Sequence, residues 1–204
     1  AVFGTASAQA SLPSLAEQAA HQEFQAFRAT LISVLQMVGF VVLPASIGLV
    51  VLAAPIVGGL FERGAFDHRA TVMTSQALAC YALGLLAFSV SKVLTGAFYA
   101  MRETWTPVKL AIEAMVLNVL LSLALMWPLR VSGLALAAAI SNTVNAYRLI
   151  RHMEARLGKS LLQPLAQPWL RTTGASLVMG GGCWIVWRLV LASPSYVGLP
   201  LVIL

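Results

Sequence analysis

Long apolar stretches alternate with short polar turns along the whole chain. A membrane-spanning helix needs about 20 mostly apolar residues. By that measure the pattern predicts five complete spans and two partial ones. The complete spans are residues 30–59, 70–99, 107–128, 133–153 and 168–192, and the partial ones are 1–16 and 197–204. Because no long alternating strands occur, the predicted fold class is all-α, a polytopic transmembrane helical bundle.

Prolines and small residues indicate where the helices of this bundle bend and where they pack closely. Pro44 and Pro55 lie inside the first complete span and are expected to kink it, as membrane helices tolerate. Small side chains on the last two complete spans permit close helix contact, so packing is their expected role. These small residues are Ala135, Ala137, Ala138, Ala139, Ser141, Gly174, Ser176 and Gly180.

Composition supports the membrane assignment. The chain is 59% hydrophobic and 10% charged, with a mean hydropathy of +0.85, whereas a soluble domain is about 25% charged. A net charge of +6 would suggest nucleic acid in a soluble protein, but here basic loops facing anionic lipid heads account for it, and no nucleic-acid partner is expected. Cys80 and Cys183 lie in separate apolar segments, so neither a disulfide framework nor a metal site is predicted.

Charge asymmetry orients the spans. Eight lysines and arginines belong to one set of loops and span ends and four to the other. Because cytoplasmic loops carry the excess of basic residues, loops 17–29, 100–107 and 154–167 are predicted to face the cytoplasm. The turn near residue 63 then faces the exterior, and the 70–99 span runs from outside to inside.

Lys92 lies within the second complete span and is the principal candidate for function. A charge within the bilayer costs about 2.5–3.5 kcal/mol on insertion scales, so such a residue usually faces a hydrated cavity or a partner. Snorkelling of its ammonium to the cytoplasmic interface is the alternative. The polar residues form no nucleophile or acid-base constellation, so the chain is not expected to be an enzyme.

Several motifs, in order, resemble the MurJ (MviN) family of lipid II flippases over about residues 8–156. They are Leu-Phe-Glu-Arg-Gly-Ala-Phe at 60–66, Lys-Val-Leu from 92, Ala-Phe-Tyr-Ala from 97, Arg-Glu-Thr from 102, and Thr-Pro-Val-Lys from 106. Leu-Pro-Ser-Leu from 12, Leu-Asn at 117, Gly-Leu-Ala-Leu-Ala from 133 and Asn-Ala at 145 extend the match. The rest of the chain matches in hydropathy only.

The resemblance implies a fourteen-helix exporter fold whose two six-helix lobes surround a central cavity. Residues 1–156 would be the end of helix eight through helix twelve, in the C-terminal lobe. Residues 157–204 would be two added helices, thirteen and the start of fourteen. We therefore expect a fragment of a larger protein in the bacterial cytoplasmic (inner) membrane. Its substrate would be lipid II or a similar undecaprenyl-pyrophosphate-linked glycan, which it would move by alternating access. Membrane lipids would be its other partners.

Further candidate residues follow from this resemblance. Lys92, Arg102 and Asn145 are candidates for the substrate cavity. For Arg102, a cytoplasmic interface anchor is favoured over a gating contact between the lobes. Asn142 and Asn145 could line the cavity, but helix packing is favoured for both. Asn118 and Ser122, four residues apart, share a helix face. The pair could form an ion site or an interhelical hydrogen bond, and the latter is favoured because Ala138 stands where some relatives have threonine. No cofactor is expected, and coupling to Na⁺ or to the membrane potential stays open.

The exterior turn holds Glu62, Arg63 and Gly64, where an ion pair beside a glycine backbone turn is expected. Two alternatives to a lipid II flippase are a flippase or drug exporter of the same superfamily with another substrate, and a non-transporting scaffold for cell-wall assembly.

Overall fold

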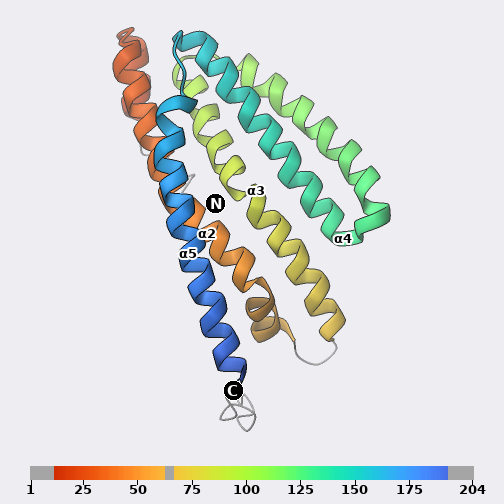
Figure 1. The fold of residues 1–204 in the computed structure, drawn as a ribbon. Helices are drawn as coiled ribbons and strands as arrows, with labels where there is room; N and C mark the ends of the chain where they lie inside the picture. The colour runs from red at the N-terminus through yellow and green to blue at the C-terminus, as the bar shows by residue number, and fades with distance from the viewer. Residues whose placement is uncertain (1–11, 63–66, 193–204) are drawn as a thin grey trace.

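The computed structural model describes residues 12–62 and 67–192, and these residues form helices joined by short turns without any strand. A helix over residues 12–20 is followed by α2 (Phe24–Phe61), α3 (His68–Ala100), α4 (Trp105–Leu157) and α5 (Leu162–Ala192). Figure 1 shows these helices side by side in one elongated bundle. The all-α prediction is confirmed.

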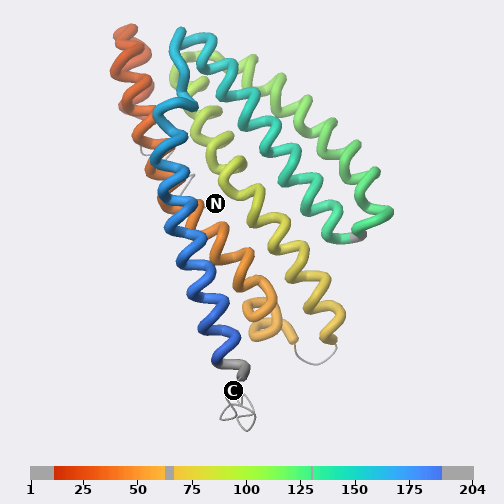
Figure 2. The backbone as a smooth tube through the Cα atoms, in the orientation of Figure 1, coloured from red at the N-terminus to blue at the C-terminus, as the bar shows by residue number. Residues whose placement is uncertain are grey.

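Local sequence sets the helix boundaries. Asp67 caps α3, since its carboxylate accepts a hydrogen bond from the Ala70 amide at 2.9 Å. Gly158 ends α4 in the left-handed conformation, with φ at 65°, which glycine adopts without steric cost. Pro44 and Pro55 both lie inside α2, and Figure 2 shows the axis of this helix changing direction along its length.

The helix α4 consists of two antiparallel arms. Residues 105–157 are helical without interruption, yet Figures 1 and 2 show the chain descending from the α3–α4 turn and then returning to the same end of the bundle. A Cβ added at Gly133 would lie only 2.3 Å from the Leu125 carbonyl oxygen, so this reversal requires glycine. We call residues 105–128 the first arm and 133–157 the second arm. They correspond to the third and fourth predicted spans.

Three stretches of the described residues are long and apolar enough to cross a membrane: Phe24–Phe61, His68–Ala100 and Trp105–Leu129. They contain the first three complete spans predicted from the sequence. The other two predicted spans are also helical and lie in the second arm and in α5. Polar side chains such as Asn142 and Asn145 lower the hydropathy of the second arm. Most of the two partial spans lies outside the described residues.

The core lies at one end of the bundle, where α2 and α5 begin and where α3 and α4 end. Its fully buried side chains come from the helix over residues 12–20, from α2 to α5 and from the turn before α5. They include Leu15, Phe27, Phe98, Leu149, Met153, Leu161 and Leu165. The turns at 21–23, 101–104 and 158–161 lie at this same end in Figure 1, as the charge asymmetry predicts.

Small residues allow α3 and the second arm to approach closely. A Cβ at Gly84 would lie 2.8 Å from the Ala139 Cα, so the two backbones nearly touch. Ala135, Ala137 and Ser141 are buried on the same arm, which confirms their predicted packing role. In α5, Ser176 is buried, whereas a Cβ at Gly174 would meet nothing within 4 Å, so the packing prediction fails at that glycine.

Candidate functional site

Lys92 lies on an exposed face of α3. Its Nζ lies over the Phe88 ring, 5.4 Å from the centroid, a cation–π distance. Phe88 is one helical turn toward the N-terminus of α3, whereas the nearer end of the helix is its C-terminus at Ala100. The ammonium is therefore directed away from the interface that snorkelling would reach, which favours the cavity interpretation of this lysine.

Lys92 lines a hollow of about 420 Å³ between α3 and the two arms of α4. The polar members of its wall are Ser91, Thr95, Tyr99, Asn142 and Asn145, and the remainder is apolar. None of its lining residues is an aspartate or a glutamate. We call it the Lys92 hollow. It brings together two of the three predicted cavity candidates, Lys92 and Asn145, with Asn142, which was considered beside Asn145.

The Asn145 side chain makes only part of its possible hydrogen bonds in this hollow. Its Nδ2 donates a long hydrogen bond of 3.5 Å to the Ser91 hydroxyl, which in turn lies beside Lys92 in the sequence. Its Oδ1 is buried and has no hydrogen-bond partner within the described part of the chain. An unsatisfied buried polar atom is costly and is typical of a site where a ligand, a water molecule or a movement completes the bonding.

Arg102, the third predicted cavity residue, lies outside the Lys92 hollow. It has a φ of 59°, a left-handed conformation that is uncommon for a non-glycine residue, and its amide donates to the Tyr99 carbonyl at 2.9 Å. Arg102 lines a second hollow of about 660 Å³ between residues 12–24 and the end of α3. We call this the Arg102 hollow. Tyr99 lines both hollows.

Two arginines near this end are paired with glutamates, which the sequence did not indicate. Arg148 on the second arm forms an ion pair with Glu113 on the first arm, so it joins the two arms of α4. Arg156 donates to the Glu103 carboxylate at 2.8 Å. These pairs join residues far apart in sequence, and no local spacing signals them.

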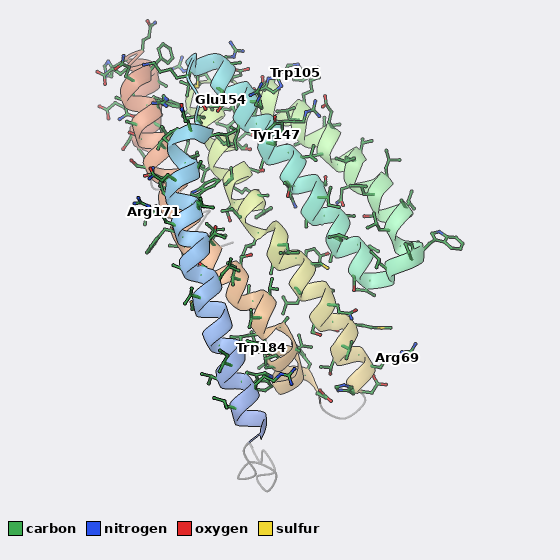
Figure 3. All side chains as sticks on the ribbon, in the orientation of Figure 1. Arg69, Trp105, Tyr147, Glu154, Arg171 and Trp184 are labelled. Carbon is green, nitrogen blue, oxygen red and sulfur yellow. The ribbon has the colours of Figure 1, made fainter. Side chains whose placement is uncertain are left out.

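Two carboxylates here have lowered pKa values. The Thr106 hydroxyl donates a hydrogen bond to the Glu103 carboxylate and lowers its pKa. Partial burial raises this pKa, but Arg156 lowers it further, so the pKa is lowered overall. Burial alone would raise the pKa of Glu154, but hydrogen bonds from the Leu162 and Leu161 amides outweigh it. Glu154 thereby caps the first turn of α5 and joins it to the end of α4 (Figure 3).

Asn118 and Ser122 do share a face, as predicted. The Ser122 hydroxyl donates to Asn118 Oδ1 at 3.4 Å within the first arm. We expected an interhelical bond from Asn118, and the contact found is instead within one helix. The bond that joins the arms comes from Ser141, whose hydroxyl donates to the Ala114 carbonyl. No group of three or more potential metal ligands occurs among the described residues.

The exterior turn is described only in part. Glu62 follows α2, and its carboxylate lies 3.2 Å from His68 Nδ1 at the start of α3. Arg63 and Gly64, which we predicted to complete an ion pair and a glycine turn, lie outside the described residues.

Comparisons with known proteins agree with the resemblance. The family model described as lipid II flippase MurJ matches residues 1–203. A probable lipid II flippase MurJ of Haemophilus influenzae is 34% identical over 189 residues, which cover 90% of this chain and 37% of that protein. The Vibrio cholerae counterpart is also 34% identical, covering 92% of this chain and 35% of its own length.

A solved structure shares the fold. The lipid II flippase MurJ in an inward closed conformation superposes with a TM-score of 0.73 at 23% identity, covering 84% of this chain and 35% of that one. The chain thus spans little more than a third of the relatives that it matches. Since the family model covers nearly the whole chain, the chain belongs to the lipid II flippase MurJ family.

Proposed function

We propose that this chain is the C-terminal portion of a flippase that moves lipid II from the inner to the outer leaflet of the bacterial inner membrane. Family membership over residues 1–203 supports the proposal. The apolar helices support a multi-pass membrane protein. Residues 1–156 then belong to the C-terminal lobe and residues 157–204 to the added helices.

The observation that carries the proposal is an unpaired cation within a helix that is long and apolar enough to cross a membrane. Lys92 has no carboxylate within ion-pair distance among the described residues, and the hollow beside it contains several neutral polar groups. A pyrophosphate headgroup cannot cross hydrocarbon unaided. A cationic, hydrated surface that opens alternately to each side lowers the free energy of its passage.

Transport of this kind makes and breaks no covalent bond, so the proposed activity needs no catalytic residue and no cofactor. A transmembrane potential or a Na⁺ gradient is the proposed driving force. The Asn118–Ser122 pair would supply at most two side-chain oxygens to such an ion. That number is small for Na⁺ coordination, so the membrane potential is the better candidate.

Complementation tests the proposal directly. In cells depleted of their essential lipid II flippase, the full-length parent protein is expected to restore growth and lipid II exposure at the outer leaflet. Failure with confirmed membrane expression would point to another lipid-linked glycan or to a scaffold. Assays with other polyprenyl-linked glycans distinguish a flippase of another substrate from a scaffold, because a scaffold would move none of them.

Lys92→Ala should reduce lipid II exposure in the same cells by roughly tenfold, since a charge-assisted hydrogen bond is worth about 1.5–3 kcal/mol. Lys92→Arg keeps the charge and should retain most of the exposure. Lys109→Gln is the matched control, because Lys109 is exposed on α4 and lines neither hollow. Wild-type exposure by Lys92→Ala at equal protein level would refute a role for this lysine in transport.

A further inference from the structure

The two hollows are joined by one face of α3. Lys92, Thr95, Tyr99 and Arg102 are spaced three, four and three residues apart, a spacing that keeps the first three on one side of a helix. Arg102 follows directly after that helix. Tyr99 lies about 10 Å along the axis from Lys92, and it lines both the Arg102 hollow and the Lys92 hollow. A continuous face therefore joins the interface end of α3 to a point inside the apolar span.

The cations on this face lack protein counter-charges. Lys92 and Arg102 have no carboxylate within ion-pair distance among the described residues, whereas Arg148 and Arg156 have glutamate partners. Lys109 and Lys159 are also without an ion pair among the described residues, but they line neither hollow. The walls of both hollows contain no aspartate or glutamate. Two cations without a protein counter-charge, one at each end of a face, suit an anionic group that can occupy either position.

The apolar part of the Arg102 hollow suits a lipid. Small or aliphatic side chains line one side of it, contributed by Leu12, Ala16, Ala19 and Ala20. An arginine beside such a wall can bind a phosphate by its planar fork while a prenyl chain lies along the apolar side. Arg102 occupies a left-handed backbone position that glycine or asparagine would adopt more readily.

We infer that this face of α3 is a two-position relay for the phosphate groups of a polyprenyl-linked lipid. Arg102 binds the phosphate at the membrane interface, and Lys92 binds it deeper in the span. Tyr99, half exposed between the hollows, marks the boundary that the phosphate crosses. The inference rests on the proposed function, since it names the route by which the headgroup would reach Lys92.

Photo-crosslinking at two phenylalanines can follow each position. Phe24 lines the Arg102 hollow and Phe88 lines the Lys92 hollow, so p-benzoylphenylalanine at either position is a modest change. The full-length protein would be placed in nanodiscs of neutral phosphatidylcholine. The probe would be undecaprenyl pyrophosphate labelled with ³²P, in the background of Arg102→Asn, Lys92→Gln or neither.

The relay predicts an asymmetric result. Arg102→Asn, which keeps a residue suited to the left-handed backbone, should lower the initial rate of crosslinking after probe addition at both positions by roughly tenfold. Lys92→Gln should lower it by a similar factor at Phe88 only. Lys109→Gln should change neither. Equal losses at both positions from Lys92→Gln, or no loss from Arg102→Asn, would overturn the relay.

Competition identifies the ligand class. Unlabelled undecaprenyl pyrophosphate should remove the signal at both positions, whereas inorganic pyrophosphate and phosphatidylglycerol should not. If phosphatidylglycerol competes equally well, the site binds anionic lipids in general. If inorganic pyrophosphate competes equally well, the site binds the free anion. Either result would refute a polyprenyl-lipid relay.

Crosslinking requires no transport, so the two proposals can fail separately. If the parent protein rescues flippase-depleted cells but the asymmetry is missing, only the relay fails. If the asymmetry is present without rescue, the relay stands and lipid II transport fails. Variants are compared at equal membrane abundance and equal thermal midpoint, so a folding defect is excluded as the cause of any loss.

Discussion

At the residue scale, the lowered pKa of Glu103 controls a contact between two distant segments. The Thr106 hydroxyl is the largest cause of that lowering, and Arg156 contributes further. The folded-state pKa of Glu103 therefore lies below the ordinary glutamate value. The stabilisation is therefore complete above the unfolded pKa and is lost as the pH falls through the folded pKa. At neutral pH the Glu103–Arg156 contact is fully formed.

Thr106→Val should raise the folded pKa of Glu103, because it removes the hydrogen bond that favours the charged form. On acidification below about pH 5, the turn at 101–104 should then lose protection at a higher pH than in the wild type. Hydrogen-exchange protection factors of these amides, corrected for intrinsic rates, measure the midpoint. Glu103→Gln serves as the control, with protection that no longer depends on this titration. Identical midpoints in Thr106→Val and wild type would contradict the assignment.

Sequence reasoning identified some of these residues and missed others for a physical reason. Lys92 was visible because a charge within a long apolar run is unusual in itself. Glu113 and Arg148 were also visible, but their pairing depends on how the two arms of α4 fold back on one another. The same holds for Glu103 and Arg156. A pair contributed by distant segments leaves no spacing signal.

At the element scale, α5 is attached chiefly through α2. The Trp169 indole donates to the Leu35 carbonyl at 3.3 Å, and it lies over Gly39, where an added Cβ would be 2.2 Å from its Nε1. Gln36 adds a bond from its amide to the Pro164 carbonyl at 3.3 Å. Gly39 is therefore the position where the aromatic ring of α5 docks onto the backbone of α2.

Gly39→Ala should destabilise the full-length protein by about 1–3 kcal/mol, because the new methyl group overpacks this contact. Thermal unfolding in detergent measures the effect as a lower midpoint. Gly181→Ala is a matched control in α5, since a Cβ there meets nothing within 4 Å, and it should leave the midpoint unchanged or slightly raise it, as alanine favours helix. Equal midpoints in the two variants would mean that Trp169 moves aside without cost.

Helix positions were largely predictable from apolar length, yet helix contacts were not. The sequence indicated the reversal before Gly133 and the packing role of Ala139. It did not indicate Gly84 as the residue that Ala139 meets, because Gly84 is a single glycine in an ordinary apolar run. Gly39 was missed likewise: nothing near it in sequence predicts that Trp169, more than a hundred residues later, lies against it.

At the scale of the whole molecule, charge asymmetry and structure agree on which turns share an end. The turns at 21–23, 101–104 and 158–161 lie together, as Figure 1 shows. In Figure 3, Trp105 and Glu154 lie at that end and Arg69 at the other. The positive-inside bias assigns the first end to the cytoplasm. That assignment also sets the direction of the proposed relay, from Arg102 at the cytoplasmic interface to Lys92 within the membrane.

Cysteine labelling tests this orientation in the full-length protein. With every native cysteine replaced by alanine, Cys80 and Cys183 included, single cysteines would be placed at His68 and Ala155, which are exposed at opposite ends of the bundle. A membrane-impermeant maleimide applied from outside the inner membrane should label His68→Cys in intact cells. It should label Ala155→Cys only after the membrane is opened. The reverse pattern would place the Arg102 hollow at the outer leaflet, and the relay would then have to describe release of the headgroup rather than its capture.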